Sequence, residues 1–208
     1  MNAVRRLLIF PYNGNGIEAL QCIGADYQFL GFVDDDPKKI GTSPNGYPIW
    51  GREAFNNCSD ACVLAVPGSP VSYSYRKEII TGLGITQDRF ARVIHPSAII
   101  SPFASIGYNL LVMPGVVITS NARIGSHICI LPNTVIHHDV VIGDWSLVGS
   151  CVSIAGGVNI ENNCYIGSGS NIKNDIRIQS GALVGLGSNV LKDVSAGAIV
   201  VGNPAKNF

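Results

Sequence analysis

The chain has 208 residues, which is enough for one large domain or two small ones. It carries 14 acidic and 14 basic residues, and this balance gives no electrostatic reason to expect nucleic acid or a membrane surface as a partner. Only 13% of the residues are charged while 24 are glycine, a composition that suits a solenoid burying much of its surface in an oligomer.

The segment Met1 to Phe10 has two arginines before an apolar run of about four residues, too short for a signal peptide or a membrane span. We therefore expect a cytoplasmic protein without membrane insertion. The six cysteines form no CxxC pair. In a reducing compartment they are expected to remain thiols and to pack as small apolar side chains.

The first half alternates short apolar runs with turns and helical stretches. Strands are predicted at Leu7–Phe10, Phe29–Val33, Cys62–Val66 and Phe90–Ile94, with helices from Ala19 toward Tyr27 and over Val71–Leu83. This alternation predicts an α/β domain over residues 1–92, with a small Rossmann-like parallel sheet. Ligands of such sheets bind at the carboxyl ends of the strands.

The loop after the first strand has the pattern Gly-x-Gly-x-x-Ala from Gly14 to Ala19. Its glycines would let backbone amides approach a phosphate at a helix N-terminus. With Asp34 about 18 residues on, the pattern alone would suggest a dinucleotide such as NAD. Because the sheet has no second mononucleotide half, one nucleotide is the simpler interpretation, and a tight turn without a ligand is the third. The candidate pocket residues are Asn13, Gly14, Asn15, Gly16, Asp34, Asp35, Pro67 and Gly68.

The second half repeats every six residues. From Ile94 to Val190 each sixth residue is aliphatic, and the residue two positions earlier is usually small or β-branched, as at Ala98, Thr134 and Ser170. Because residues two apart in a strand face the same side, each hexad supplies one large and one small inward side chain. Glycine often follows the aliphatic residue, and we expect it to provide the freedom in φ that a corner needs.

Three short strands per turn make a triangular prism with about 18 residues per coil, so the repeats predict roughly five stacked coils. We therefore predict an all-β parallel β-helix over residues 93–208. The general rule for parallel crossovers favours a right-handed coil, and the periodicity alone does not overturn that rule.

His138 stands two residues after the inward Ile136, which places it at a corner with its side chain outside the core. Gly156 follows 18 residues later, one coil along the same corner, so its N–H is expected near the imidazole. This predicts a base and a hydrogen-bond donor on one face, with Asp139 orienting the ring.

Two other interpretations of this corner stay open. His138 could be a solvated corner residue, or the neighbouring His137 could be the base instead. His95 and His127 are expected to be structural. No metal is expected, because no spacing in the sequence gathers three ligands.

Five motifs combine with the glycine loop to suggest a family. They are His95-Pro96-Ser97-Ala98, Met113-Pro114-Gly115-Val116-Val117-Ile118, Val135-Ile136-His137-His138-Asp139, Ala155-Gly156-Gly157-Val158 and Gly202-Asn203-Pro204-Ala205-Lys206. The two-part layout resembles the sialic acid O-acetyltransferases and bacillosamine-pathway sugar N-acetyltransferases, hexapeptide-repeat acyltransferases with an N-terminal nucleotide-sugar-binding domain. The resemblance implies a left-handed β-helix, a homotrimer, and acetyl-CoA as co-substrate without a metal.

The resemblance also implies residue roles. His138 would be the general base, Asp139 its support, and the Gly156 amide a donor to the thioester oxygen. It implies coenzyme contacts at Leu147, Ala155, Gly156, Ser168, Gly185, Leu186, Gly187, Asn203, Pro204 and Lys206. Many family members have histidine where this chain has Leu147, and Gly-His-Gly where it has Gly14-Asn15-Gly16.

We therefore expect an acetyl-CoA-dependent N-acetyltransferase that acts on a nucleotide-linked 4-amino-4,6-dideoxy sugar in surface glycan biosynthesis. O-acetylation of a sialic acid is the alternative within the same class. A noncatalytic β-helix scaffold or binding protein, and a nicotinamide enzyme, are the alternatives from other classes.

Overall fold

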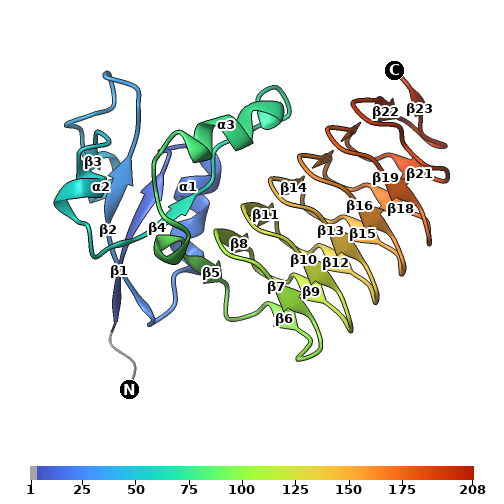
Figure 1. The fold of residues 1–208 in the computed structure, drawn as a ribbon, viewed down its shortest axis with the longest axis horizontal. Coiled ribbons are helices and arrows are strands. Elements are labelled where there is room, and N and C mark those ends of the chain that lie inside the picture. Colours follow the sequence, from blue (N-terminus) through green and yellow to red (C-terminus); the bar gives the residue numbers. More distant parts are fainter. Residues whose placement is uncertain (1–3) are drawn as a thin grey trace.

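The computed structural model describes residues 4–208 and has two parts, a small α/β domain and a long coil of short strands (Figure 1). Residues 1–3 of the segment Met1 to Phe10, whose length argued against a signal peptide, lie outside the described part. Within residues 4–208, no helix is both long enough and apolar enough to cross a membrane.

The N-terminal domain has a four-stranded parallel sheet in the order β3-β2-β1-β4, which confirms the predicted parallel sheet. The strands are β1 (Arg5–Phe10), β2 (Tyr27–Val33), β3 (Ile49–Trp50) and β4 (Cys62–Ala65). The helices and 3₁₀ turns are α1 (Gly14–Glu18), η1 (Ala19–Cys22), η2 (Pro44–Gly46), α2 (Ala54–Asn57), η3 (Tyr73–Tyr75), α3 (Arg76–Thr81) and η4 (Gln87–Arg89). The sequence pattern does not predict β3.

Both predicted helices are shorter than expected. The first ends at Cys22, because the backbone of the next residue, Ile23, is extended with ψ 110°. Before the second helix, the Ser69 hydroxyl accepts hydrogen bonds from the N–H groups of Val71 and Ser72, both at 3.3 Å. This local turn competes with helix formation, so α3 begins only at Arg76.

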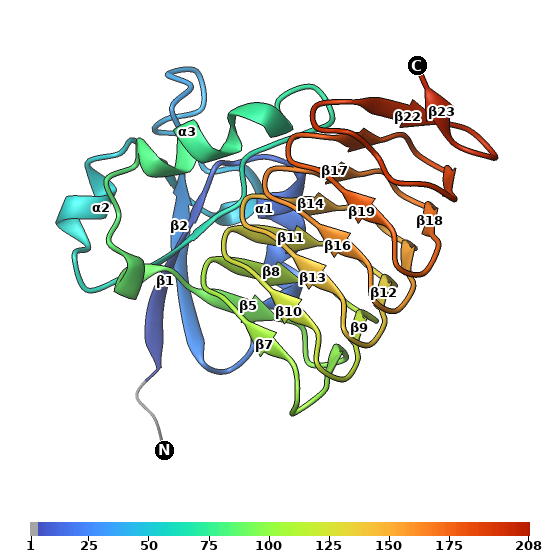
Figure 2. The same ribbon diagram turned by 45° about the vertical axis from the view of Figure 1, so that its right-hand side comes forward.

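Three sheets run along the coil and form its faces (Figures 1 and 2). The six-stranded sheet contains β6 (Ile99–Ile100), β9 (Val117–Ile118), β12 (Val135–Ile136), β15 (Ser153–Ile154), β18 (Asn171–Ile172) and β21 (Asn189–Val190). The five-stranded sheet contains β7 (Ser105–Ile106), β10 (Arg123–Ile124), β13 (Val141–Ile142), β16 (Asn159–Ile160) and β19 (Arg177–Ile178). The eight-stranded sheet contains β5 (Arg92–Ile94), β8 (Leu110–Val112), β11 (Ile128–Ile130), β14 (Leu147–Val148), β17 (Tyr165–Ile166), β20 (Leu183–Val184), β22 (Ile199–Val201) and β23 (Lys206–Asn207).

Stacked strands are offset by the predicted 18 residues, as in the parallel pair Val135 and Ser153. The predicted inward aliphatics from Val112 to Val190 are at most 4% exposed and form the core. The small polar residues between them are also buried and bond to the backbone. The Thr134 hydroxyl, for example, donates to the Gly149 carbonyl at 2.6 Å. Each coil therefore completes the interior of the next.

The glycines that follow the aliphatic positions are needed for a reason other than the predicted one. None of Gly107, Gly125, Gly143, Gly149, Gly167 and Gly185 has a positive φ. A Cβ at Gly149 would stand 2.5 Å from the backbone nitrogen of Ser168, so the close approach of the next coil excludes a side chain. The positive φ angles come two residues later, at Asn109, His127, Trp145, Cys151, Gly169 and Gly187.

The N-terminal domain covers the eight-stranded sheet. Outward side chains of that sheet, such as Leu111, Cys129 and Leu147, share an apolar cluster with Ile9 and Leu64 of the N-terminal sheet. The strand predicted at Phe90–Ile94 contacts both sheets: Phe90 forms a parallel bridge with Val63 of β4, while β5 pairs with β8 of the coil. The chain therefore passes from one sheet to the other over residues 90–94, and the boundary between residues 92 and 93 stays a prediction.

Candidate active site

His138 and Asp139 occupy the corner between β12 and β13, where the six-stranded sheet passes into the five-stranded sheet. Their side chains are 63% and 56% exposed. Asp139 has a left-handed backbone (φ 62°), and its N–H donates to the Ser120 carbonyl of the preceding coil at 3.0 Å. This turn leaves both side chains outside the prism, at the position that the repeat predicts.

Asp139 orients the imidazole of His138 through a 2.8 Å contact between Oδ2 and Nδ1. Because a carboxylate only accepts hydrogen bonds, the neutral ring carries its proton on Nδ1 and has a free lone pair on Nε2. The hydrogen bonds from His138 and from Asn121, whose Nδ2 lies 3.0 Å from Oδ1, lower the pKa of Asp139. The carboxylate therefore stays charged at neutral pH.

Gly156 lies directly under the imidazole of His138. A Cβ at residue 156 would stand 2.6 Å from both Cε1 and Nε2 of the ring, so only glycine leaves room for it. Within residues 4–208, the Gly156 N–H finds no hydrogen-bond acceptor. The expected proximity of His138 and Gly156 is thus present, while their chemical roles remain predictions.

The other three histidines differ from His138 in their surroundings. His95 bonds within its own turn, to Ser97. His127 is 3% exposed and stacks on Trp145, and burial lowers its pKa to about 4. His137 is exposed, and among the described residues its side chain has no hydrogen-bond partner. Its imidazole therefore lacks the carboxylate that fixes the tautomer of His138.

A pocket of about 330 Å³ lies between the N-terminal domain and the coil. The N-terminal loops contribute Asn13, Gly14, Asn15, Gly68, Ser69 and Pro70, and the coil contributes Leu131, Leu147, Val148, Gly149 and Tyr165. The pocket therefore sits at the carboxyl ends of β1 and β4, where a parallel sheet binds ligands.

Four predicted pocket residues line this cavity, namely Asn13, Gly14, Asn15 and Gly68, and four others do not, namely Gly16, Asp34, Asp35 and Pro67. Gly16 is buried, and its N–H donates to Asn13 Oδ1 at 2.8 Å. Pro67 is also buried, directly before the lining residue Gly68.

The two acidic candidates are engaged by other parts of the N-terminal domain. Asp34 accepts hydrogen bonds from the N–H groups of Tyr12 and Asp36, both at 2.9 Å, and from Lys39 Nζ at 3.0 Å. Asp35 pairs with Arg52 at 2.6 Å. Neither carboxylate is therefore free to accept a hydrogen bond from a ribose hydroxyl, which is the usual acidic contact in such sheets. The geometry does not support the roles predicted for Asp34 and Asp35.

The coil side of the pocket was not predicted from the sequence, apart from Leu147, for which the resemblance implied a coenzyme contact. Leu147 and Tyr165 are the outward residues of β14 and β17, each directly before an inward aliphatic. A row of large apolar residues at outward positions of one face signals that another part of the protein covers this face. That signal was present in the sequence at Leu111, Leu147 and Tyr165.

The residues implied to bind the coenzyme lie at several places on the coil. Ala155 and Gly156 share the corner of His138, whereas Ser168 and the segment Gly185–Gly187 lie at the corner between the eight- and six-stranded sheets. Leu186 is 83% exposed there. Asn203, Pro204 and Lys206 are in the C-terminal tail. Leu147 is instead buried at the domain junction, 5% exposed.

The pocket and His138 lie on different sides of one chain. The pocket is against the eight-stranded sheet, while His138 is at the corner that joins the other two sheets. In a triangular prism this corner is opposite the covered face (Figure 2). A single chain therefore does not bring the histidine to the pocket.

The described residues also contain no group of three or more His, Cys, Asp or Glu side chains that could hold a metal ion.

Comparison with known proteins identifies the family of the coil. Residues 90–202, more than half of the chain, match the family model described as GMPPB C-terminal domain. The chain belongs to this family. No curated protein matches its sequence.

Several solved structures share the two-part fold over nearly the whole chain. PerB from Caulobacter crescentus, in complex with CoA and GDP-perosamine, is 24% identical with a TM-score of 0.83, covering 98% of this chain and 97% of its own. The acetyltransferase domain of PglB from Neisseria gonorrhoeae FA1090 is 23% identical with a TM-score of 0.82, covering 98% and 100%. WeeI from Acinetobacter baumannii AYE is 27% identical with a TM-score of 0.83, covering 99% and 100%. These similarities confirm the predicted resemblance and the fold class, an α/β domain followed by a left-handed β-helix.

Proposed function

We propose that this protein is an acetyl-CoA-dependent N-acetyltransferase that acts on a nucleotide-linked 4-amino-4,6-dideoxy sugar in surface glycan biosynthesis. The observation that carries the proposal is the His138-Asp139 pair with its imidazole over Gly156. The similar structures support it: PerB is in complex with CoA and GDP-perosamine, and the PglB acetyltransferase domain with acetyl coenzyme A.

In the proposed reaction the sugar amine attacks the thioester carbonyl carbon. Nε2 of His138 accepts the proton that the amine loses, because Nδ1 is engaged by Asp139. The charge of Asp139 stabilises the imidazolium that forms. The carbonyl oxygen gains negative charge and accepts a hydrogen bond from the Gly156 N–H. The C–S bond then breaks, the imidazolium returns the proton to the leaving sulfur, and free CoA and the amide are the products.

The proposed active site combines two protomers of a homotrimer. One protomer would supply the pocket, and the corner of His138 in its neighbour would close it. The outward row of the six-stranded sheet supports this arrangement, because it has no charged residue: Ile99, Val117, Val135, Ser153, Asn171 and Asn189. This face connects the two corners with implied coenzyme residues, and a neighbouring prism could pack along it with little desolvation cost.

The pocket between the domains is the proposed site of the nucleotide sugar. Asn15, Gly14 and Gly68 would contact its polar part at the ends of the strands, while Leu131, Leu147 and Tyr165 offer an apolar wall to the deoxygenated sugar. The pocket lining contains no acidic or basic side chain. The amine proton therefore has to go to a group outside this lining, which the His138 corner of the neighbouring protomer would provide.

A substrate panel tests the proposal. The protein is incubated with acetyl-CoA and with GDP-, UDP- or dTDP-linked 4-amino-4,6-dideoxy sugars, and thiol release and the mass of the acetylated product are recorded. We expect turnover with at least one of the three nucleotides. Acetylation of a free sialic acid without any activity on the amino sugars would replace the proposal by O-acetylation, and no thiol release at all would favour a noncatalytic protein.

A further inference from the structure

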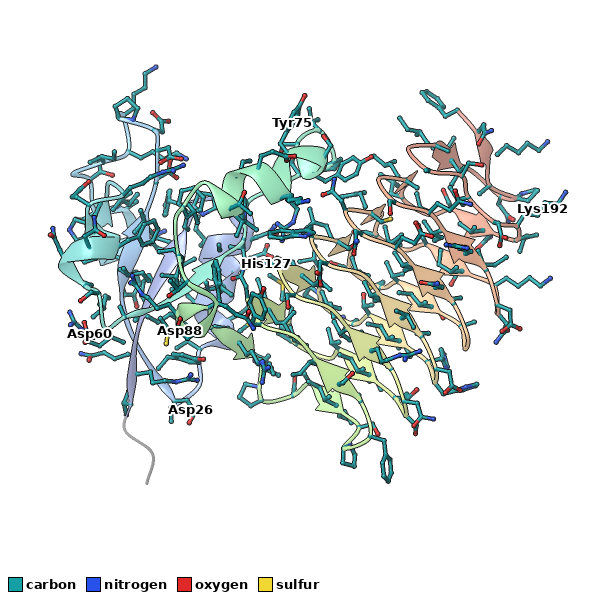
Figure 3. The ribbon with its side chains drawn as sticks, viewed as in Figure 1. Asp26, Asp60, Tyr75, Asp88, His127 and Lys192 are labelled. Carbon is teal, nitrogen blue, oxygen red and sulfur yellow. The ribbon has the colours of Figure 1, made fainter. Side chains whose placement is uncertain are left out.

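Arg76 at the start of α3 is the largest of the fully buried side chains. Its guanidinium donates to three main-chain carbonyls from both parts of the protein. Nη1 donates to Pro67, Nη2 to His127 at 2.7 Å, and Nε to Trp145 at 3.1 Å. Pro67 belongs to the N-terminal domain and the other two carbonyls to corners of the coil. One side chain therefore ties the domains together at the junction where Figure 3 labels His127.

This cation has no acidic partner. The ion pairs found among residues 4–208 do not include Arg76. A buried charge without a counter-ion is costly unless its donors are satisfied, so the carbonyls must be held in place around the guanidinium. The dependence is mutual, because loss of the side chain would leave buried carbonyls unpaired.

The Pro67 carbonyl, which Arg76 binds, stands directly before the segment that forms one wall of the pocket. Pro67 directly precedes Gly68, Ser69 and Pro70, which line the cavity. Gly68 has φ 120°, and a Cβ there would meet Leu147 Cδ1 at 3.0 Å and the Arg76 side chain at 3.1 Å. The Arg76 side chain thus lies against this wall and also bonds to Pro67, the residue directly before it.

The same segment is fixed to the coil at its other end. Tyr73 donates from its hydroxyl to the Gly181 carbonyl at 2.8 Å, and its ring lies 5.7 Å from that of Tyr165. Asn163 Nδ2 donates to the Ser74 carbonyl at 3.1 Å. Segment 67–76 therefore runs from the N-terminal sheet to the coil beside the pocket. Arg76 is the only charged residue of this segment.

We propose that Arg76 is a positioning residue that sets the width of the pocket by fixing the wall Gly68–Pro70 against Leu147 and Tyr165 of the coil. The identity of the pocket's ligand rests on the proposed function above, whereas the fixing of the wall does not. Arg76 would act through the wall and would not touch the substrate.

Arg89 provides a matched control. It also donates to three main-chain carbonyls, those of Ala61 at 3.1 Å, Phe55 at 3.0 Å and Cys58 at 3.0 Å. All three lie within the N-terminal domain, and Arg89 does not line the pocket. Arg89→Met and Arg76→Met thus each remove three bonds to main-chain carbonyls, but only the second removes a bond to Pro67, the residue directly before the pocket wall.

Hydrogen exchange tests the positioning role without any assumption about activity. The amides of Ser72, Tyr73 and Tyr75 are bonded within the segment, so they report on its order. In Arg76→Met we expect the peptide covering 67–76 to exchange about tenfold faster or more, while peptides of the coil core are unchanged. In Arg89→Met this peptide should exchange as in the wild type. Equal exchange of the peptide in all three proteins would overturn the proposal.

Kinetics then connects the wall to the ligand. With an active nucleotide sugar, Arg76→Met should raise KM for the sugar about tenfold while KM for acetyl-CoA changes little. Arg76→Lys, which keeps the charge but cannot reach three carbonyls, should be intermediate and serves where Arg76→Met does not fold. If no sugar nucleotide is a substrate, the proposed function fails while the exchange result still decides the role of Arg76. Equal effects on both KM values would overturn a role specific to this pocket.

Discussion

The imidazole of His138 lies over the backbone of Gly156, where a Cβ would be 2.6 Å from Nε2. The Gly156→Ala variant should therefore displace the base. Because the ring is at an exposed corner, it can rotate away, and the free energy of unfolding should change by less than about 1 kcal/mol. We expect kcat to fall by about 10²-fold because the base is misplaced. Steady-state kinetics and urea unfolding measure the two effects.

Gly24→Ala is the control for that substitution, since a Cβ at residue 24 meets nothing within 4 Å. Its kcat should equal that of the wild type. Full activity in Gly156→Ala would contradict the proposed geometry of base and donor.

The pair His137 and His138 permits a test on adjacent residues. His138→Ala should lower kcat by about 10²- to 10⁴-fold, because no other base is held by a carboxylate at this corner. His137→Ala should keep most of the activity. Both side chains lie at the surface of the prism, so Tm should be unchanged in each variant. The reverse order of effects would assign the base to His137.

Asp139→Asn separates the charge of Asp139 from its backbone role. Asparagine tolerates the left-handed conformation that Asp139 adopts, so the corner should be preserved. Its amide can donate to Nδ1 and thereby move the ring proton to Nε2, which would block the base. We expect kcat to fall by about 10²- to 10⁴-fold with an unchanged Tm. A variant with nearly wild-type kcat would show that the carboxylate does not control the tautomer.

The 18-residue periodicity explains why the corner could be predicted from the sequence. Stacked coils repeat the same geometry, so the neighbour of residue 138 along the prism had to be residue 156. Even so, the role of the corner glycines was predicted wrongly. Periodicity locates Gly149, but the contact with Ser168 that excludes a side chain depends on the distance between coils.

The domain junction could not be predicted in this way. Arg76 bonds to residues 51 and 69 positions later in the chain, and no local pattern connects them. The same holds for Asp34. Its place after a strand suggested a ligand contact, which stays a prediction, whereas its bonds to Lys39 and to the Tyr12 amide could not be predicted from that place. The outward apolar residues Leu111, Leu147 and Tyr165 indicate that this face of the coil is covered, but the individual hydrogen bonds across the junction follow no repeat and could not be predicted from it.

Subunit complementation tests whether the active site is shared. Gly14 lines the pocket, and a Cβ there meets nothing within 4 Å, so Gly14→Trp should fill the pocket without disturbing the fold. Alone, Gly14→Trp and His138→Ala should both be inactive. In trimers reassembled from equal amounts of the two, about a quarter of the interfaces combine an intact pocket with an intact histidine. We therefore expect recovery of about a quarter of the wild-type rate.

Gly24→Trp mixed with His138→Ala controls for the bulk of the new side chain, since residue 24 is also open and is outside the pocket. All pockets in these trimers are intact, so the activity of each shared site should depend only on whether the neighbouring subunit carries His138. If mixing Gly14→Trp with His138→Ala restores nothing although mixed trimers form, the pocket and the base belong to the same subunit or to different reactions.

Acid should destabilise the domain junction through His127. Burial, and then the charge of Arg76, lower the pKa of His127 to about 4, while an unfolded histidine titrates near 6.5. Between these values the unfolded chain binds a proton that the folded chain does not. The free energy of unfolding should therefore fall as the pH falls from about 6.5 to about 4, by roughly 3 kcal/mol from this residue.

The measurement is urea unfolding between about pH 4 and pH 7 for the wild type and for His127→Gln, which does not titrate in this range. Other groups act equally in both proteins, so the difference between the two curves isolates His127. Glutamine loses the stacking on Trp145, whose ring centroid is 3.9 Å away, so the variant should be less stable at pH 7. The free energy of unfolding of the variant lacks the pH-dependent contribution of His127. The difference in this free energy between the wild type and the variant, here called the gap, should therefore become smaller toward about pH 4. A gap that stays constant would mean that His127 accepts a proton in the folded protein as readily as in the unfolded chain, which its burial between Trp145 and Asn109 argues against.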